Sequence, residues 1–245
     1  MNIAIITQAR TTSSRLPEKI LLTAKKISLL KHHILRLKQS ELPVIVATTT
    51  NQGDNAIINI CKRNSIPYYR GNENDVLSRF YECALENNIE IIIRVTSDCP
   101  LIDAQLILEG LKKYLSIYEM GKKVYLSNTL IRTFPKGMDF EIFSFDMLKE
   151  AFNNAILKIE REHVTPYFYQ GKDKTIELIN FSNERNTSNI RITLDYKRDY
   201  FFIKTLIEKY NAHLLPNKSI EDIVLGCKEL MKLNNLCIQT AQLIN

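Results

Sequence analysis

Short apolar runs alternate with amphipathic stretches along most of the chain. NIAIITQ, VIVATTT and IEIIIRVTSD are rich in β-branched residues and almost continuously apolar, which is typical of strands that are buried on both faces; they span residues 2–8, 44–50 and 89–98. PYYR, at 67–70, predicts a further short strand. Apolar residues between these runs recur at spacings of three and four, which predicts helices at about 27–37, 51–64 and 73–87.

The second half of the chain continues this pattern with more interruptions. We expect a helix at roughly 103–118, an extended YLSNT segment and a strand from Met138 to Phe143. Residues 144–170 are then predicted to be helical until Pro166. TIELINF and NIRITLD predict two more strands, and residues from about 197 onward are predicted to be helical. Repeated strand–helix units predict an α/β fold with a mostly parallel sheet and helices on both faces. We expect a single domain over 1–245, in which 120–170 form an insertion or flap.

Composition narrows the class of protein. The 245 residues are 45% apolar and 24% charged, which is an ordinary globular balance and excludes a disordered chain. The five cysteines are odd in number and form no CxxC pair, so we expect neither a disulfide framework nor a structural zinc site. There is no apolar run of membrane-spanning length and no signal-peptide pattern, so we expect a cytoplasmic protein with no membrane partner.

The positive charge is concentrated near the start of the chain. The net charge is +6, but residues 1–40 alone hold eight Lys or Arg and one acid, so the remainder is close to neutral. A duplex-binding protein more often spreads its basic residues over an extended face. A local cluster fits a compact polyphosphate better, and we expect no nucleic-acid partner.

The segment QARTTSSRLPEK, at 8–19, follows the first predicted strand. Arg10, Arg15 and Lys19 are opposed by Glu18 alone, and the hydroxyls of Ser13 and Ser14 lie between them. Ligands bind beyond the carboxyl ends of parallel strands, so this loop is well placed to hold a polyphosphate. It contains no glycine, which excludes a Walker A loop or a GxGxxG dinucleotide loop. From these residues alone, a solvated basic turn is an equally good interpretation.

Two aspartates are predicted to lie at the same sheet edge. Asp98 follows the strongest predicted strand and precedes Pro100, and Asp195 ends NIRITLD just before a predicted helix. Carboxylates of this kind bind Mg²⁺ together with phosphate oxygens and water. Each aspartate alone is equally typical of a helix cap or a turn.

Several motifs, taken in order, resemble a known family. QARTTSSRLPEK resembles the signature of cytidylyltransferases that make CMP-activated sugars, roughly Q/P-A-R-x-x-S-x-R-L-P-x-K. The chain is most similar to the spore-coat polysaccharide biosynthesis subgroup, which is related to 3-deoxy-manno-octulosonate cytidylyltransferase. The other matching motifs are VATTTN (46–51), YRGNENDVLSRFYECA (69–84), RVTSDCPLID (94–103), SNT (127–129), PKGMDFEIFSF (135–145) and REHVTPY (161–167). Thr12, Glu18 and Ser97 stand where glycine is common in the subgroup, and Tyr196-Lys197-Arg198 replaces Thr-Pro-Glu.

The resemblance implies a Rossmann-like nucleotidyltransferase fold, a GT-A-like three-layer sandwich. It also implies that CTP and Mg²⁺ are bound, with Asp98 and Asp195 as the metal ligands. The residues implied for catalysis are Arg10, Arg15, Lys19, Asp98 and Asp195. Those implied for nucleotide binding are Gln8, Ala9, Arg10, Ser13, Arg15, Lys19, Thr48, Gly71, Asp75, Arg79 and Ser97.

The implied reaction is transfer of CMP from CTP to a small-molecule acceptor, with release of pyrophosphate. The acceptor oxygen itself attacks the α-phosphorus, so no protein nucleophile is required. The acceptor is expected to be a sugar acid or a phosphorylated compound for surface polysaccharide biosynthesis, contacted by Asn128, Asp139, Glu141, Arg161 and His163. The EREH cluster at 160–163 is equally typical of a surface ion-pair cluster. The family also implies a homodimer, with 125–169 as a candidate contact.

Two other functions fit parts of the sequence. A glycosyltransferase would share a nucleotide-binding α/β fold, but the chain has no DxD motif. A non-catalytic nucleotide-binding or RNA-binding protein would not require paired aspartates at separate strand ends. Release of pyrophosphate from CTP distinguishes a cytidylyltransferase from all of these.

Overall fold

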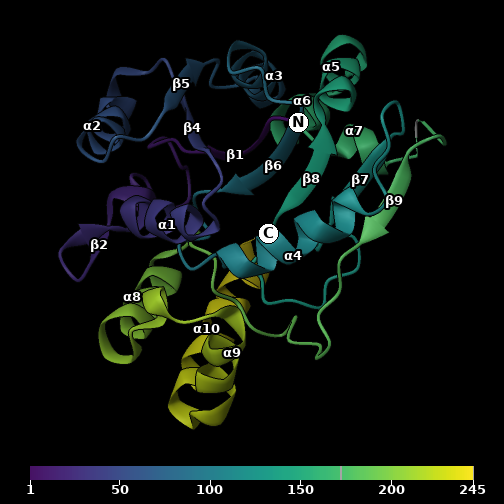
Figure 1. Ribbon diagram of the computed structural model, residues 1–245. Helices are drawn as coiled ribbons and strands as arrows, with labels where there is room; N and C mark the ends of the chain where they lie inside the picture. Colours follow the sequence, from purple (N-terminus) through teal and green to yellow (C-terminus); the bar gives the residue numbers. More distant parts are fainter. Residues whose placement is uncertain (172, 245) are drawn as a thin grey trace.

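The centre of the protein is a seven-stranded sheet, seen in a computed structural model that describes residues 1–171 and 173–244 (Figure 1). Residues 172 and 245, which fall in the predicted domain 1–245, lie outside the described residues. The strand order is β5-β4-β1-β6-β8-β7-β9. The strands are β1 (Ile3–Gln8), β4 (Val44–Thr49), β5 (Tyr68–Gly71), β6 (Ile91–Thr96), β7 (Val124–Ser127), β8 (Glu141–Ser144) and β9 (Glu177–Asn180).

The parallel half of the sheet positions the candidate site. β1 pairs in parallel with β4 on one side and with β6 on the other, and β4 pairs in parallel with β5. β8 runs antiparallel to both β6 and β7, while β7 and β9 are parallel. Within the described part of the chain, the sheet is therefore mostly parallel, and the predicted mixed α/β fold is confirmed.

Helices cover both faces of this sheet (Figure 1). One face is covered by α3 (Val76–Glu86), α5 (Phe145–Asn154), α6 (Lys158–His163) and α7 (Pro166–Tyr169). On the other face lie α1 (Leu29–Leu37), α2 (Asn55–Arg63), α4 (Ala104–Leu115), α8 (Lys197–Tyr210) and α9 (Asn217–Gly226). The last helix, α10 (Lys228–Ile244), packs against α8 and α9. The short elements are the hairpin β2 (Thr23–Ala24) and β3 (Ile27–Ser28) and the 3₁₀ turns η1 (Lys19–Leu21), η2 (Lys38–Ser40), η3 (Gln52–Asp54) and η4 (Ala212–Leu214).

The apolar runs form strands because both faces of the sheet are covered. In β1, Ala4 and Ile6 pack into the core beneath α3 and α5, while Ile5 packs into the opposite core. Successive side chains of a strand point to opposite faces, so a central strand between two helical layers is apolar at every position. Polar residues are therefore tolerated only where the strand ends, which is where the candidate chemistry begins.

The prediction of a strand at NIRITLD is wrong. Residue 189 is in a turn and 195 in a bend, and the residues between them form one isolated bridge, at Arg191 with Lys136. The segment pairs with two loops rather than with a strand: Ile192 N donates to Lys136 O at 2.7 Å and Leu194 N donates to Asp98 O at 2.8 Å. The segment lies at the end of the sheet, where it brings Asp195 to Asp98 without joining the ladder. The predicted strand over 138–143 begins only at Glu141, the helical stretch 144–170 is three helices, and the β2–β3 hairpin was not predicted.

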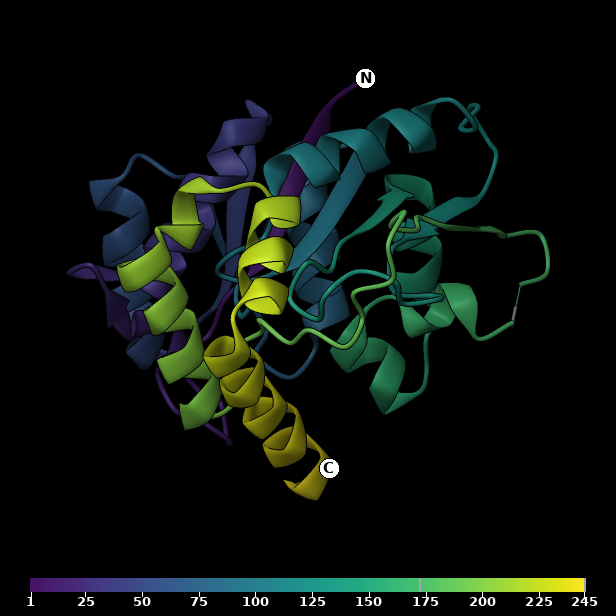
Figure 2. The same cartoon turned by 90° about the horizontal axis from the view of Figure 1, so that it is seen from below.

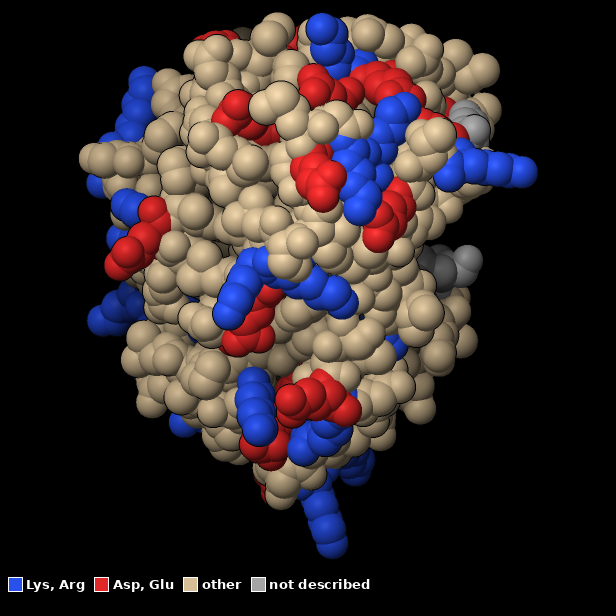
Figure 3. Space-filling view, turned by 45° about the vertical axis from the view of Figure 1, so that its right-hand side comes forward, with Lys and Arg blue, Asp and Glu red and all other residues tan. Residues whose placement is uncertain are grey.

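The outer surface carries mixed charge. Figure 3 shows Lys and Arg interspersed with Asp and Glu on the β7–β9 side, where Lys123 pairs with Glu150 and Asp173. α10 extends away from the body at the opposite end from the N-terminus (Figure 2). None of the helices described over 1–171 and 173–244 has the length and apolarity of a membrane span.

Candidate active site

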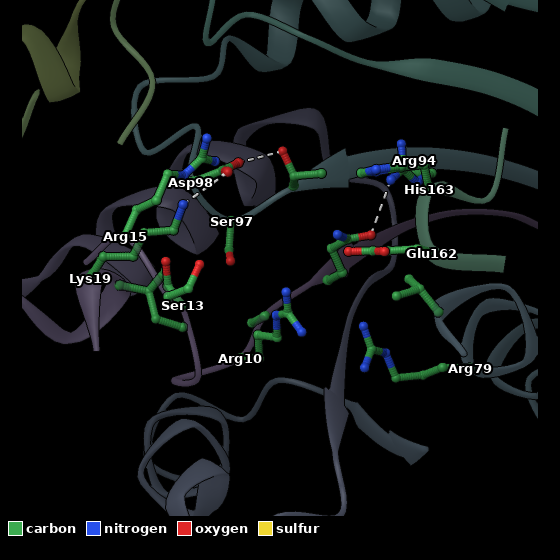
Figure 4. Close-up of a pocket in the computed structure, with 16 residues that line it drawn as sticks. Arg10, Ser13, Arg15, Lys19, Arg79, Arg94, Ser97, Asp98, Glu162 and His163 are labelled. Atoms are coloured by element: carbon green, nitrogen blue, oxygen red, sulfur yellow. Dashed lines mark hydrogen bonds and ion pairs between the residues drawn. The ribbon is translucent and has the colours of Figure 1, made fainter. Parts of the chain in front are cut away.

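A cavity of about 360 Å³ opens at the carboxyl ends of β1 and β6 (Figure 4). It is lined by residues of four segments that are far apart in the sequence: the 8–20 loop, the start of α3, the end of β6 and the end of α6. The predicted residues that line it are Gln8, Ala9, Arg10, Ser13, Arg15, Lys19, Arg79, Ser97, Asp98 and His163. The structure thus brings most of the predicted nucleotide-binding set to one place.

The loop at 8–20 is shaped by a buried carboxylate. Asp54 is fully buried and accepts hydrogen bonds from Thr11 N at 2.8 Å, Thr11 Oγ1 at 2.7 Å and Thr49 Oγ1 at 2.5 Å. Burial alone would raise the pKa of Asp54, but the bonds from Thr49 and Thr11 hold it below its usual value. Thr48 Oγ1 also donates to Asp54, and Thr48 is fully buried outside the cavity lining. The predicted nucleotide residue Thr48 therefore supports the loop rather than lining the cavity.

Glu18 shows how the loop forms without glycine. Its φ is 55°, in the left-handed region that glycine usually occupies. Its backbone N–H donates to Thr11 O at 2.9 Å. This bond closes the loop and aims Lys19 inward.

Lys19 joins the two predicted metal ligands. Its Nζ lies 3.2 Å from Asp98 Oδ2 (Figure 4). It also lies 3.0 Å from Asp195 Oδ1 and donates to Leu194 O at 2.6 Å. Arg15 Nη2 lies 2.9 Å from the same Asp195 oxygen. Burial would lower the pKa of Lys19, but the two carboxylates raise it above its usual value. Two acids from distant segments therefore converge on one cation at the cavity edge.

Asp195 is held from behind by a buried ion-pair network. Arg191 Nη2 lies 3.0 Å from Asp195 Oδ2 and 2.7 Å from Asp199 Oδ2, and Asp199 accepts the backbone N–H of Asp195 at 2.8 Å. Burial would raise the pKa of Asp195, but Lys19, Arg15 and Arg191 lower it to about 2. Asp195 is therefore ionised throughout the neutral range, with one oxygen facing Lys19.

The far end of the cavity holds two buried arginines. Arg79 is 1% exposed, donates to Asn72 O at 2.9 Å, and leaves its Nε without a partner among the described residues. Burial, reinforced by Arg10, lowers the pKa of Arg79 to about 10. Arg94 was not predicted; it donates to Gln8 Oε1 at 3.2 Å and to Glu141, and its Nε likewise has no partner in the described part of the chain. Both guanidiniums are therefore buried and incompletely hydrogen-bonded among the described residues.

Asp75 and Arg161 were predicted to bind the nucleotide and the acceptor, but they bind each other. Asp75 caps α3 through Ser78 N at 2.9 Å and accepts Arg161 Nε at 3.0 Å. Neither side chain lines the cavity. Gly71 does not line the cavity either, and an added Cβ there would lie 2.9 Å from the Cγ of Arg79. These three residues shape the wall against which Arg79 packs.

A second cavity of about 190 Å³ adjoins the first and shares Arg94 and Thr96 with it. It is lined by the predicted acceptor residues Asp139 and Glu141 and by the unpredicted Thr129 and Arg132. Arg132 forms a bidentate pair with Asp139 at 2.5 and 2.9 Å. Asn128, also predicted, is fully buried and instead holds Met138 O and Phe140 N at 2.6 and 3.0 Å.

A family model described as "Cytidylyltransferase" matches residues 4–230. The chain belongs to the cytidylyltransferase family. Two relatives have similar coverage. An uncharacterized protein of Methanocaldococcus jannaschii is 35% identical over 230 residues, covering 91% of this chain and 89% of the relative. The spore coat polysaccharide biosynthesis protein SpsF of Bacillus subtilis is 27% identical over 231 residues, covering 91% of this chain and 92% of the relative.

Solved structures agree with this family. A cytidylyltransferase from Leptospira borgpetersenii is 32% identical, with a TM-score of 0.88 over 96% of this chain and 97% of that one. A CMP:2-keto-3-deoxy-manno-octonic acid synthetase complexed with CTP has a TM-score of 0.60 at 14% identity, over 84% of this chain and 98% of that one, which is a likeness of fold. Membership of the family supports nucleotidyl transfer from CTP by this cytidylyltransferase, and the predicted resemblance is confirmed.

The donor set at the edge of the cavity fits a divalent cation. Asp98 Oδ2 and Asp195 Oδ1 come from two segments, and both lie within 3.2 Å of one ammonium group, so they already face a shared cationic position. Asp98 is the more exposed of the two, with 28% of its side chain accessible against 9% for Asp195. Mg²⁺ prefers such a pair completed by phosphate oxygens and water. The described residues form no cluster of three or more acids, His or Cys, so further ligands would come from substrate.

Proposed function

We propose that this cytidylyltransferase transfers CMP from CTP to a small-molecule acceptor and releases pyrophosphate. The observation that carries the proposal is the convergence of Asp98 and Asp195 on Lys19, directly beside the cationic loop. A catalyst of phosphoryl transfer has to position the triphosphate and neutralise the charge that develops on its oxygens. The cavity offers a cationic wall and Asp98, and Asp195 lies beside it, in contact with Lys19.

The cations of the loop are the proposed seat of the triphosphate. Arg10, Arg15 and Lys19 line one side of the cavity, together with the hydroxyl groups of Ser13 and Ser14. Arginine forks bind phosphate oxygens in pairs, while a lysine ammonium follows a moving charge. Arg10 lies 3.8 Å from Glu73 and Arg15 pairs with Asp195, so a bound triphosphate would replace these two acids as partners of the loop cations.

Asp98 and Asp195 are the proposed ligands of Mg²⁺. A bound Mg²⁺ would supply Lewis-acid stabilisation of the α-phosphoryl oxygens and of the leaving pyrophosphate. The protein residues contribute separately: Arg191 and Asp199 fix Asp195, Thr96 Oγ1 donates to Asp98 Oδ1 at 2.6 Å, and Lys19 balances both carboxylates. Each carboxylate is therefore held in place before substrate arrives.

The second cavity is the proposed acceptor site. It opens beside the first at Arg94 and Thr96, so an acceptor there would lie next to the α-phosphate of the nucleotide. We propose a sugar acid or a phosphorylated acceptor used in surface polysaccharide biosynthesis. The name of the Bacillus subtilis relative supports a role in polysaccharide biosynthesis, and the name of the octonic acid synthetase supports a sugar acid as the acceptor. His163, at the rim of the first cavity, is proposed to contact the acceptor hydroxyl.

Pyrophosphate release tests the proposal. Purified protein with Mg²⁺ is incubated with CTP, ATP, GTP or UTP and with a panel of sugar acids and phosphorylated acceptors. CTP-specific release that requires one acceptor supports the transferase and identifies its substrate. Release of pyrophosphate from no nucleotide, together with the absence of CTP binding, would contradict it. A homodimer with a contact in 125–169 is a proposal that rests on the same family, and a single domain and a cytoplasmic location are proposals that rest on the sequence pattern.

A further inference from the structure

Val164 has a strained backbone. Its φ is 70° and its ψ is −57°, and Thr165 N donates to His163 O at 2.8 Å across it. These values define a γ-turn of the rare positive-φ form. A β-branched residue is disfavoured there, because its branched side chain crowds the backbone. Of the positive-φ residues other than glycine in the described chain, Val164 is the one with a β-branched side chain.

The two residues beside this turn have different surroundings: His163 lines the first cavity, and Thr165 is buried against a residue of the second. His163 ends α6 and lines the first cavity (Figure 4). Thr165 Oγ1 donates to Glu141 Oε1 at 2.6 Å, and Glu141 lines the second cavity and pairs with Arg94. The tight turn therefore links His163, in the wall of the first cavity, to Glu141, in the wall of the second, through Thr165.

Both ends of the segment are fixed. Upstream, Arg161 binds Asp75 on α3 and donates to Phe152 O at 2.8 Å, and the fully buried Glu160 accepts Leu157 N at 3.1 Å. Downstream, Thr165 is tied to Glu141. The Val164 side chain is itself fully buried in the core beneath α3 and α5. The backbone at Val164 cannot relax to a negative φ by a shift of the segment, because contacts on both sides hold the neighbouring residues in place.

We propose that Val164 is a positioning residue, whose strained turn fixes His163 in the wall of the first cavity so that the imidazole contacts the acceptor. This role rests on the proposed function, in which the acceptor occupies the second cavity. Val164 touches no substrate in this account and acts through His163. Strain that the surrounding structure maintains is commonly found where a side chain must be held in one orientation.

The strain is tested by a matched set of variants. Val164→Gly and Val164→Ala both remove the buried side chain, but only glycine relieves a positive φ. We therefore expect Val164→Gly to melt about 3 °C higher than Val164→Ala. Val124, fully buried in β7, is the control with ordinary strand geometry, and there the glycine variant should melt lower than the alanine variant. If the glycine and alanine variants melt in the same order at both positions, the inference that Val164 is strained is wrong.

Positioning is tested by the state of the imidazole. Nuclear magnetic resonance of the ring nitrogens, assigned with His163→Gln, should show one His163 environment in wild type and in Val164→Ala. In Val164→Gly the signals should broaden or split, although this variant is the more stable of the two. Identical His163 spectra in the two variants would overturn the positioning role.

Kinetics distinguish this role from packing alone. With an acceptor that supports turnover, Val164→Gly should lower kcat about tenfold relative to Val164→Ala, with KM for CTP unchanged. The double variant His163→Gln/Val164→Gly should be no slower than His163→Gln. If the decreases in kcat caused by the two substitutions add up in the double variant, Val164 does not act through His163. If the protein neither binds CTP nor turns it over, the proposed function fails, while the melting order and the His163 spectra still test the strain at Val164 and its effect on His163.

Discussion

Replacing Lys19 by methionine removes the cation on which Asp98 and Asp195 converge. The side chain is 11% exposed, and its Nζ lies 3.2 and 3.0 Å from the two carboxylates. At an effective dielectric constant of about 20, each contact has a gross attraction of about 5 kcal/mol. Desolvation offsets most of this, but removing one partner of a buried pair typically costs about 3–5 kcal/mol. Arg15 and Arg191 still neutralise Asp195, so we expect a loss of about 3 kcal/mol.

Thermal unfolding measures this loss directly. For a chain of this size, about 3 kcal/mol corresponds to a melting temperature about 6–12 °C lower than wild type. Lys149→Met is the matched control, because Lys149 is exposed on α5 and lines neither cavity. It should melt within about 2 °C of wild type.

The effect of Mg²⁺ on the melting temperature is a second measurement on the Lys19→Met variant. If Asp98 and Asp195 form the cation site, removing the ammonium should let Mg²⁺ bind the carboxylate pair more tightly, so Mg²⁺ should raise the melting temperature of Lys19→Met more than that of wild type. CTP affinity should fall about 30-fold, from a loss of about 2 kcal/mol in phosphate binding. A Lys19→Met protein that melts like the control and binds CTP normally would refute the reasoning.

Three further predictions concern the acids around Lys19. Asp98→Asn should lower turnover by at least about 10²-fold while the melting temperature stays within a few degrees; near-normal turnover would contradict the metal assignment. Arg191→Met should cost about 3–5 kcal/mol in urea unfolding, because it leaves Asp199 buried without its partner, whereas Arg185→Met, whose pair with Asp222 is more than half exposed, should cost less than about 1 kcal/mol; equal losses would disprove the network. Asp195 has a folded-state pKa of about 2, below its unfolded value of 3.8, so it stabilises the protein by about 2 kcal/mol above pH 4, and this is lost as the pH falls through 2. Urea unfolding from pH 5 to pH 2 should show a shallower decline for Asp195→Asn than for wild type, and parallel curves would contradict the assigned pKa.

The sequence was informative where one physical rule decides the outcome. Buried parallel strands have to be apolar on both faces, so β1, β4 and β6 were predictable from their residues alone. Since ligands bind at the carboxyl ends of such strands, the loop after β1 and Asp98 after β6 were placed correctly relative to each other. Both line the first cavity.

What the sequence did not reveal depends on pairing between distant segments. Arg94 lies within the strongest apolar run, where a single arginine gives no sign that it will reach Gln8 and Glu141. NIRITLD has the composition of a strand, but the edge of β6 is already occupied by β8, so the segment pairs with loops instead. Asp75 and Arg161 are 86 residues apart, and only the fold shows that they neutralise each other.

The most direct test of the central claim is a calorimetric titration of CTP into the wild-type protein in the presence of Mg²⁺, with UTP and ATP titrated in parallel. The account predicts that CTP binds to one site per chain, more tightly than UTP or ATP, and that the affinity falls in Lys19→Met but not in Lys149→Met. CTP binding that is absent, or that is unaffected by Lys19→Met, would contradict the assignment of this cavity as the nucleotide site.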